Sequence, residues 1–550
     1  MWCAGCRYPD SEIAPDVARQ AARAAASRVA FIDHATESLV LAPRAHATLN
    51  ATAYDSTAVP LTDRRISFVS LNPAVATVDD RGRVYAKAVG SSRIELSVED
   101  ARDTIPISVD AAEQGTTLVH IFPQQEFQRM EGWEAHHQSG ELDCNPANFV
   151  RYQNELFDRA VDTLGINRLR LEVRSGMEAP HLRNPGGNEA QSRAVSFGTP
   201  WFSPVNDNDD PSVANPAGFQ FDWFDYNVTS TILPLRDRLA KRGEHLFVNL
   251  TYVDFFQSTP FEQMRDPREY AELLAVTFDH MQRVFGFVPD AIETILEPDN
   301  TPWTPEQVGA AIVAAGDRLA AAGFRPQFLA PSTTNLGAAV RFYDRLHRVP
   351  RVNDYVRTLV YHRYSGVSRA SLHQLRLRAR RDHLGMAMLE HMGGTAEELH
   401  DDLTLGHVGS WERFALAYCS QRVNPDAEGV YFQIALKRGQ APQVVFTNEA
   451  RLLRHYFAFV REGAQRIGAA TTDQEISPVA FRNTNGSQVV ILRTRRGGSF
   501  SVAGLAPGRY AVLWTTSANG HSESHDAVVA TDGRLKAMIP GAGFVTIYAH

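Results

Sequence analysis

The sequence has few cysteines, little basic charge and no long apolar run, and each shortage excludes a class of protein. Only 4 of its 550 residues are cysteine, too few for a disulfide framework. The formal net charge is −8, without a basic block, which disfavours nucleic acid or an anionic membrane as partner. No apolar run approaches the ~20 residues that span a bilayer. A hydrophobic content of 44% instead indicates a folded protein of several domains.

The four cysteines allow several interpretations. Cys144 and Cys419 are far apart in the sequence, and we expect them to be free thiols in the core. The opening "MWCAGC" ends like a bacterial lipoprotein signal but lacks the preceding apolar region. Either Cys6 carries a lipid anchor, or the pattern is chance. A metal or redox site at Cys3 and Cys6 is less favoured, because no second Cys/His pair lies nearby.

Short strands punctuated by turns dominate residues 36–112, after a lead or linker at 1–35. The segment "RISFVSLNPAVATVDDRGRVYAKAVGSSRIELSV" alternates apolar and polar residues and breaks at "NP", "DDRG" and "VGSS". This pattern predicts a small antiparallel sandwich. Its residue pattern resembles the bacterial Ig-like group 2 module. The resemblance implies an exported bacterial protein that is secreted, periplasmic or on the cell surface.

Helix-period segments alternate with short apolar runs through residues 113–442. The predicted helices include "NFVRYQNELFDRAVDTLG", "REYAELLAVTFDHMQRVFG" and "WERFALAYCSQRV", and the last predicted strand is "GVYFQIAL". Eight such strands predict a (β/α)8 barrel. An open doubly wound sheet is less favoured, since no Gly-rich phosphate loop follows the first strand.

The remainder, residues 443–550, predicts a last barrel helix followed by a C-terminal β-sandwich. Hairpin signals occur at "NTNG", "RRGG" and "LAPG". The strand-like "TTLVHIFPQQEFQ" ahead of the barrel exceeds what the barrel needs, so we expect it to pair into this sandwich.

Two of the predicted barrel strands end in glutamate. Glu297 follows the apolar run of "AIETILEP" and precedes a proline, which cannot continue a sheet ladder. Glu390 ends "GMAMLE" before a Gly-Gly pair. Catalytic groups of such barrels project from the carboxyl ends of the strands, and paired carboxylates perform glycoside hydrolysis. The strands also bring these candidate residues to the same end: Trp133, Glu134, Arg170, Asn249, Tyr252, Ser332, His362, Tyr364, His391 and Gln433.

The barrel resembles clan A of the glycoside hydrolases, and within it family 30, through "FQRMEGWEA", "HRYSG" and "LLRHYFAFVREGAQRIGA". The resemblance covers roughly residues 115–550. It implies that Glu297 is the acid/base and Glu390 the nucleophile of a retaining mechanism. It further implies that Arg170 holds Glu390 ionised and that His362 and Tyr364 shape the sugar pocket.

One departure from the clan concerns the residue before the acid/base. The clan usually has Asn there, bonding the sugar 2-hydroxyl, whereas this chain has Leu296. The missing contact must come from elsewhere, and Asn300, Asn249 and His136 are the candidates; otherwise the sugar lacks that group or the barrel has lost activity.

A connection of roughly fifty residues follows the second barrel strand, and loops of this length are usually functional. Four aromatic residues in it either stack on sugar or pack the loop onto the barrel: Trp201, Phe202, Trp223 and Phe224. Its "DNDD", residues 207–210, has Ca²⁺-ligand types, but a solvated acidic turn is favoured. We expect no metal site and no cofactor.

Together these features predict a monomeric, exported glycoside hydrolase that acts on a β-linked polysaccharide or oligosaccharide. It would contain an N-terminal Ig-like β-sandwich, a TIM barrel and a C-terminal β-sandwich. The alternatives are a carbohydrate-binding or adhesion protein on a barrel that has lost catalysis, and a transglycosylase.

Overall fold

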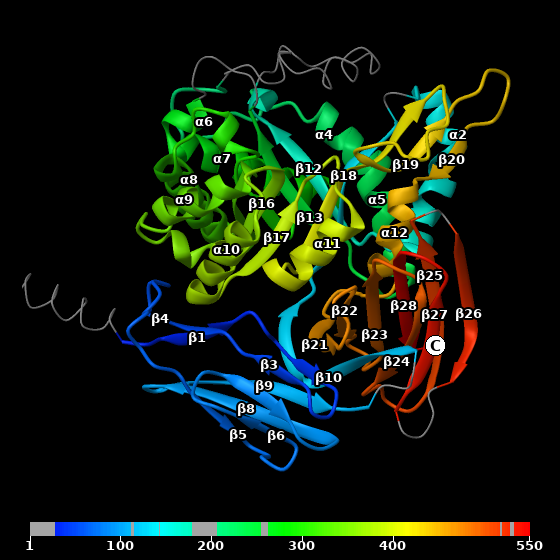
Figure 1. The fold of residues 1–550 in the computed structure, drawn as a ribbon. Helices are drawn as coiled ribbons and strands as arrows, with labels where there is room; N and C mark the ends of the chain where they lie inside the picture. The colour runs from blue at the N-terminus through cyan, green and yellow to red at the C-terminus, as the bar shows by residue number, and fades with distance from the viewer. Residues whose placement is uncertain are drawn as a thin grey trace, which may run out of the picture.

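The computed structural model describes residues 28–111, 115–141, 144–178, 206–254, 262–517, 520–528 and 533–549. Figure 1 shows three bodies: a helix-covered barrel, a small blue β-unit below it and an orange-to-red β-unit beside it. None of the helices in these described ranges is long and apolar enough to cross a membrane.

Eight parallel strands form a closed barrel. In order they are β11 (Gly132–Ser139), β12 (Arg168–Arg174), β13 (Phe247–Val253), β14 (Ala291–Glu293), β15 (Gln327–Asn335), β16 (Val356–Ser365), β17 (Gly385–Leu389) and β18 (Ser410–Ser420). Closure occurs between β18 and β11, which pair in parallel from Gly132 and Ser410 onward. The TIM barrel predicted from the sequence is therefore present.

Helices cover the outside of this barrel. They are α2 (Pro146–Asp158), α4 (Asp222–Asn227), α5 (Leu233–Lys241), α6 (Glu262–Arg265), α7 (Pro267–Phe285), α8 (Pro305–Ala321), α9 (Leu336–Leu346), α10 (Arg369–Asp382), α11 (Ala396–Asp401) and α12 (Asn448–Phe457). Local sequence sets their ends. Thr304 and Gln307 form a capping box ahead of α8, and Gly286 ends α7 in the left-handed conformation.

The eighth barrel strand differs from the prediction. The segment "WERFALAYCSQRV", predicted to be a helix, forms all of β18 except its first residue, and the predicted eighth strand "GVYFQIAL" contains β19 (Val430–Ala435). Strand β19 pairs with β18 outside the closed barrel and continues to β20 (Gln443–Phe446). Glu, Arg, Ala and Leu favour helices, but burial between β17 and β11 overrides this weak preference.

The C-terminal unit is a nine-stranded sheet around its own apolar core. Its order is β26 (His521–Val528), β25 (Arg509–Thr516), β28 (Gly543–Ala549), β23 (Gln488–Thr494), β22 (Ile476–Arg482), β21 (Gln465–Thr471), β10 (Thr116–Arg129), β24 (Gly498–Ala503) and β27 (Leu535–Ile539). Strand β10 precedes the barrel yet pairs with β21 and β24. This confirms that "TTLVHIFPQQEFQ" joins the C-terminal unit.

The N-terminal unit consists of short strands in three small sheets. These are β1 (Phe31–His34) with β4 (Ala51–Tyr54); β2 (Leu39–Leu41), β9 (Ala101–Val109), β8 (Gly90–Val98) and β5 (Ser67–Ser70); and β3 (His46–Thr48), β7 (Arg83–Ala86) and β6 (Ala76–Val78). They enclose one apolar core that includes Ile94, Leu96 and Ile105. Their resemblance to an Ig-like module stays a prediction.

Ion pairs fasten the N-terminal unit to the rest of the molecule. Asp33 accepts hydrogen bonds from Arg376 at 2.9 Å and pairs with His373 at 2.7 Å, both on α10. Glu37 accepts from Arg466 of β21 at 2.7 Å and contacts His407 at 2.7 Å. The N-terminal unit is thus docked on the amino-terminal side of the barrel, away from the strand ends that carry Glu297 and Glu390.

A disulfide joins Cys144 to Cys419, with Cα atoms 5.4 Å apart. The expectation of two free thiols was therefore wrong. The two cysteines are 275 residues apart in sequence, but they lie at the ends of neighbouring strands: Cys144 soon after β11 and Cys419 within β18. Only the closure of the barrel reveals this proximity. Cys3 and Cys6 lie outside the described residues.

Candidate active site

Glu297 lies at the carboxyl end of the fourth barrel strand in a strained backbone conformation. Its φ of 52° and ψ of 57° are left-handed, which is uncommon for a residue other than glycine and costs about 1–3 kcal/mol. The backbone N–H of Glu297 donates to the Ser332 carbonyl oxygen at 3.0 Å, and Pro298 opens a short 3₁₀ turn directly after it. The chain therefore turns away at Glu297 and leaves its side chain at the barrel mouth.

Glu390 follows the last residue of β17 and is held by two donors. Arg170 of β12 donates from Nη2 to one of its carboxylate oxygens and from Nη1 to the Leu389 carbonyl oxygen at 3.0 Å. The Tyr364 hydroxyl donates to the other carboxylate oxygen at 2.7 Å. Both carboxylate oxygens of Glu390 are thus engaged by groups that stabilise the ionised form.

His362 links the two glutamates. A carboxylate oxygen of Glu297, one of Glu390 and a ring nitrogen of His362 all lie within 4.8 Å of one another. The Nδ1 atom of His362 is 2.9 Å from Oε1 of Glu297, while Asn300 donates to Oε2 at 2.9 Å. The structure therefore brings Glu297, Glu390, Arg170, His362 and Tyr364 together, with Asn300 at the edge.

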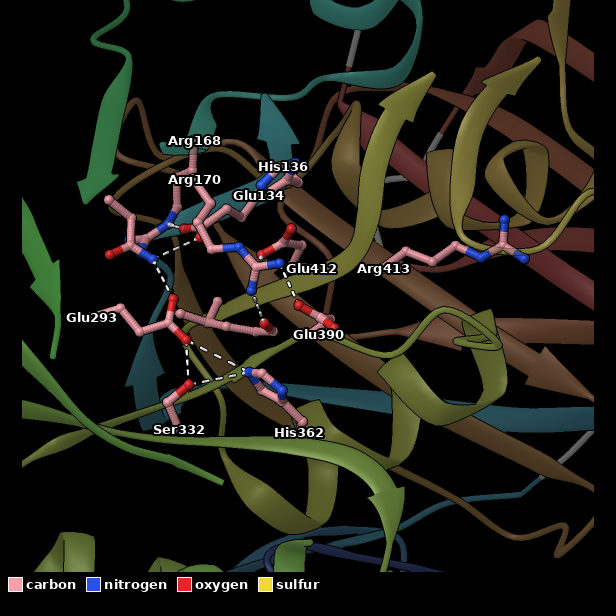
Figure 2. Close-up of polar contacts among 12 residues, drawn as sticks. Glu134, His136, Arg168, Arg170, Glu293, Ser332, His362, Glu390, Glu412 and Arg413 are labelled. Carbon is pink, nitrogen blue, oxygen red and sulfur yellow. Dashed lines mark hydrogen bonds and ion pairs between the residues drawn. The ribbon is translucent and has the colours of Figure 1, made fainter. Parts of the chain in front are cut away.

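A layer of buried polar groups supports these residues from inside the barrel (Figure 2). Ser332 donates to Glu293 and lies 3.2 Å from Nε2 of His362. Asn249 donates to both Glu293 and Glu134, at 3.0 and 2.9 Å. Through Ser332, this network fixes the position of the His362 ring.

Arg170 lies between two carboxyl groups, those of Glu390 and Glu412 (Figure 2). Glu412 of β18 is 3.6 Å from Arg170 and fully buried. The adjacent Arg413 points away from the barrel centre and donates to backbone carbonyl oxygens, including that of Val430. Glu412 and Arg413 point to opposite faces because successive side chains of a strand alternate between its two faces.

The charges around Glu390 and His362 determine the protonation state of each group. Burial opposes the ionisation of Glu390, but Arg170, His362 and Tyr364 hold its pKa below the ordinary value. Burial would also lower the pKa of His362, yet the carboxylates of Glu293 and Glu297 raise it to about 10. At neutral pH the site therefore contains an ionised Glu390 and a cationic His362.

The site has the residue types of a metal centre, but its contacts are those of an acid–base pair. Both Glu390 oxygens accept from Arg170 and Tyr364, and both Glu297 oxygens contact His362 and Asn300. A cationic His362 and the guanidinium of Arg170 already supply positive charge to the carboxylates. This donor set does not favour a metal ion.

Three residues expected at the pocket lie elsewhere. Trp133 is fully buried, stacked on Phe457 of α12 and donating to the Val460 carbonyl oxygen. Asn249 is fully buried within the polar layer. Gln433 lies on β19, outside the closed barrel, and accepts from the N–H of Asn424 at 2.6 Å. Trp133 and Asn249 are therefore buried inside the protein. Gln433 was expected at the pocket because its segment was predicted to be the eighth barrel strand.

His136 is close to the site but not in direct hydrogen-bond contact with either glutamate in the described residues. Its Nε2 is 3.0 Å from Glu172 and its ring stacks on Phe414. Burial lowers its pKa, so the ring is neutral at pH 7. Of the three candidates for the contact that Leu296 cannot make, only Asn300 is exposed and touches a member of the pair.

Sequence reasoning missed Glu293, Glu412 and Glu172. Glu293 was visible as a charged residue inside an apolar run, which is itself a signal of a buried functional network. Glu412 was hidden by the helix predicted around it.

The long connection after β12 is described at residues 175–178 and from residue 206 onward. Trp223 and Phe224 are 4% and 1% exposed in α4, so both pack the connection onto the barrel. Trp201 and Phe202 lie outside the described residues.

Comparison with known proteins places the fold among glycoside hydrolase structures. No protein-family model matches the chain, and no curated protein matches it significantly. The catalytic domain of family 30 xylanase C from Talaromyces cellulolyticus is similar in structure, with a TM-score of 0.57 and 13% identity over 79% of this chain and 100% of that one. An endo-β-1,6-glucanase matches with a TM-score of 0.56 and 14% identity, over 88% and 99% of the two chains. A conserved exported protein from Bacteroides fragilis matches with 0.55 and 13%, over 78% and 100%. These likenesses show a shared fold.

Proposed function

We propose that this chain is a retaining glycoside hydrolase of β-linked glycans, with Glu390 as nucleophile and Glu297 as acid/base. The observation that carries the proposal is the pair itself: carboxylate oxygens from the fourth and seventh strands lie within 4.8 Å of each other at the barrel mouth. Carboxyl groups about 5–5.5 Å apart are typical of retention, whereas inversion needs about 6.5–9.5 Å to admit a water.

The environments of the two carboxyl groups support their different roles. Glu390 accepts hydrogen bonds from Arg170 and Tyr364, which favours the anion that attacks the anomeric carbon. Glu297 contacts Asn300 and the cationic ring of His362, a group that can exchange a proton, and within the described residues it contacts no arginine. Glu297 is therefore the better candidate for the group that exchanges a proton with the leaving oxygen and then with water.

The reaction would proceed in two displacements. Glu390 forms a bond to the anomeric carbon as the glycosidic bond breaks, and Glu297 gives its proton to the departing oxygen. Water then attacks the glycosyl-enzyme, losing a proton to Glu297 and releasing Glu390. The layer of Glu293, Ser332 and His362 holds the acid/base in place throughout, because its hydrogen bonds fix the His362 ring.

The similar solved structures support the proposed substrate class, and the disulfide supports the proposed export of the protein. A xylanase and an endo-β-1,6-glucanase with this fold suggest a β-linked polysaccharide as substrate class. The Cys144–Cys419 bridge suits an oxidising compartment, which favours an exported protein.

The test is product release from a panel of β-linked polysaccharides and aryl glycosides. We expect release by the wild type and at least a 10³-fold loss in Glu297→Gln and Glu390→Gln. Glu306→Gln, on the exposed face of α8, serves as control. Glycan binding without turnover by any of these proteins would overturn the proposal and favour a carbohydrate-binding barrel, with Leu296 as the cause.

A further inference from the structure

Glu412 lies beside Arg170 but takes no part in the hydrogen bonds that hold the catalytic pair (Figure 2). Its side chain points from β18 into the barrel and is fully buried. In the part of the chain that the structure describes, neither of its carboxylate oxygens has a hydrogen-bond partner. Nη1 of Arg170 is 3.6 Å away, which is longer than a hydrogen bond. Glu412 is therefore a buried carboxyl group without a donor among these residues.

The other buried carboxyl groups nearby each accept hydrogen bonds. Their donors are Arg168 and Asn249 for Glu134, Asn249 and Ser332 for Glu293, and Arg170 and Tyr364 for Glu390. Hydrogen bonds of this kind stabilise the ionised form of a carboxyl group. Glu412 differs from all three groups in lacking them.

The possible donors around Glu412 are engaged with other groups. Arg170 donates from Nη2 to Glu390 and from Nη1 to the Leu389 carbonyl oxygen at 3.0 Å. The hydroxyl of Tyr431, on β19, donates to a backbone carbonyl oxygen of β11 at 2.8 Å and accepts from a backbone N–H of β18 at 2.7 Å. Neither side chain offers Glu412 a hydrogen bond that would stabilise its negative charge.

Carboxyl groups also outnumber cations in this network. The carboxyl groups are those of Glu134, Glu293, Glu297, Glu390 and Glu412, and the cations that they contact are Arg168, Arg170 and His362. Burial raises the pKa of Glu412 well above its ordinary value; Arg170 opposes the rise, whereas the charges of Glu134, Glu390 and Glu293 add to it. Repulsion among buried carboxylates is relieved when one of them keeps a proton.

We infer that Glu412 keeps a proton at neutral pH and acts as a positioning residue, which holds Arg170 in place for Glu390 without competing for its charge. An ionised Glu412 would draw the guanidinium toward itself and place a second negative charge near the nucleophile. Both effects would raise the pKa of Glu390. The protonated group fills the same space beside Arg170 without either effect. The positioning role rests on the proposed function, because it acts through the nucleophile; the proton on Glu412 does not.

The buried proton predicts how stability depends on pH. A carboxyl group whose pKa is raised by folding binds more protons in the folded state, so the folded state loses stability as pH rises above the ordinary value of 4.5. Glu412→Gln removes this loss, because an amide does not titrate. The ratio of the folding equilibrium constants, variant over wild type, should therefore rise between about pH 5 and 8, by up to about tenfold per pH unit.

Urea unfolding of the full chain measures this ratio, and Glu306→Gln is the control. It carries the same substitution on the exposed face of α8, where the hydrogen bond from Arg345 holds the pKa of Glu306 below the ordinary value. Its ratio should stay constant over the same range. Glu412→Met, which is uncharged and of similar length, repeats the comparison if the glutamine variant does not fold.

Infrared spectroscopy detects the proton directly. The difference spectrum of wild type minus Glu412→Gln at pH 7 should contain the C=O stretch of a protonated carboxyl group. The corresponding spectrum for Glu306→Gln should contain carboxylate bands instead.

The pH dependence of kcat/KM tests the positioning role. Glu412→Ala leaves Arg170 without its neighbour, so the acid limb should move to higher pH as the pKa of Glu390 rises. Glu412→Gln should restore the acid limb of the wild type, since its amide has the size of a protonated carboxyl group.

Three results would overturn the inference. They are a stability ratio for Glu412→Gln or Glu412→Met that does not rise with pH, an infrared difference spectrum without the protonated carboxyl band, and an acid limb of Glu412→Gln at lower pH than that of the wild type. Each would mean that Glu412 is ionised and competes for Arg170. The unfolding and infrared measurements need no substrate, so a failure of the glycosidase test would leave them unaffected.

Discussion

Tyr364 illustrates how a single hydroxyl group sets the charge of the proposed nucleophile. It donates to Glu390 at 2.7 Å while the residue remains 40% exposed, so its removal leaves the core intact. A hydrogen bond to a charged group contributes about 1.5–3 kcal/mol. We predict that Tyr364→Phe lowers kcat/KM about 10- to 100-fold.

Tyr364→Phe should also shift the pH dependence of kcat/KM. Loss of the hydroxyl raises the pKa of Glu390, so the acid limb of kcat/KM should move to higher pH. Tyr548→Phe is the matched control, because Tyr548 also donates to a glutamate, Glu523, far from the site. An unchanged acid limb in Tyr364→Phe would show that Glu390 does not control it.

His362 should make stability depend on pH. Its pKa is about 10 in the folded protein and about 6.5 when unfolded, so its stabilising effect is complete below pH 6.5 and lost as pH rises to 10. We predict that His362→Gln destabilises the protein more at pH 6 than at pH 10, measured by urea unfolding. An equal loss at both pH values would mean that His362 is neutral in the folded state.

At the scale of residues, the sequence indicates which side chains lie at the barrel mouth where a side chain ends an apolar run. Glu297 and Glu390 stand out for that reason, and their neighbours Arg170, His362 and Tyr364 also fall at strand ends. Trp133 and Asn249 fall at similar positions, but their side chains point into the α12 interface and the barrel interior. Which way a strand-end side chain points depends on sheet register, and a single sequence does not contain it.

At the scale of elements, the disulfide between the loop after β11 and strand β18 should stabilise barrel closure. Bridges of this kind contribute about 2–4 kcal/mol. We predict that the double variant Cys144→Ser/Cys419→Ser has a lower Tm than the wild type and that dithiothreitol lowers the Tm of the wild type alone. Peptide mapping without reduction should yield a linked Cys144–Cys419 pair. Two unlinked peptides would contradict the structure.

The eighth strand shows why element prediction failed at one place. The segment around β18 is rich in residues that favour helices, and an inward Glu412 breaks the apolar pattern expected of a buried strand. Arg170 of β12 provides the partner that makes this glutamate tolerable inside the barrel. Because that partner is remote in sequence, local patterning favours the wrong element.

At the scale of the whole molecule, the N-terminal unit is docked through buried charges. Arg466 is 3% exposed at its side chain and pairs with Glu37, so Glu37→Gln leaves a buried guanidinium with a weaker partner. Breaking such a pair costs about 3–5 kcal/mol. We predict that calorimetry of Glu37→Gln shows the N-terminal unit melting before the barrel, whereas the wild type melts in one transition.

At low pH the N-terminal unit of the wild type should also melt before the barrel. Burial opposes the ionisation of Glu37, but Arg466 and His407 hold its pKa far below the ordinary value, so its contribution is present above about pH 4.5 and is lost as pH falls. Burial also lowers the pKa of His407 to about 4, which adds a loss of stability below pH 6.5. A single transition in Glu37→Gln and at low pH would mean that other contacts hold the unit.

The anomeric configuration of the first product tests the central claim most directly. Proton NMR would follow hydrolysis of a β-linked substrate from the panel by the wild type. Double displacement through Glu390 predicts that the β-anomer appears first and mutarotates later. If the α-anomer appears first, the mechanism is a single displacement, and Glu390 is not the nucleophile.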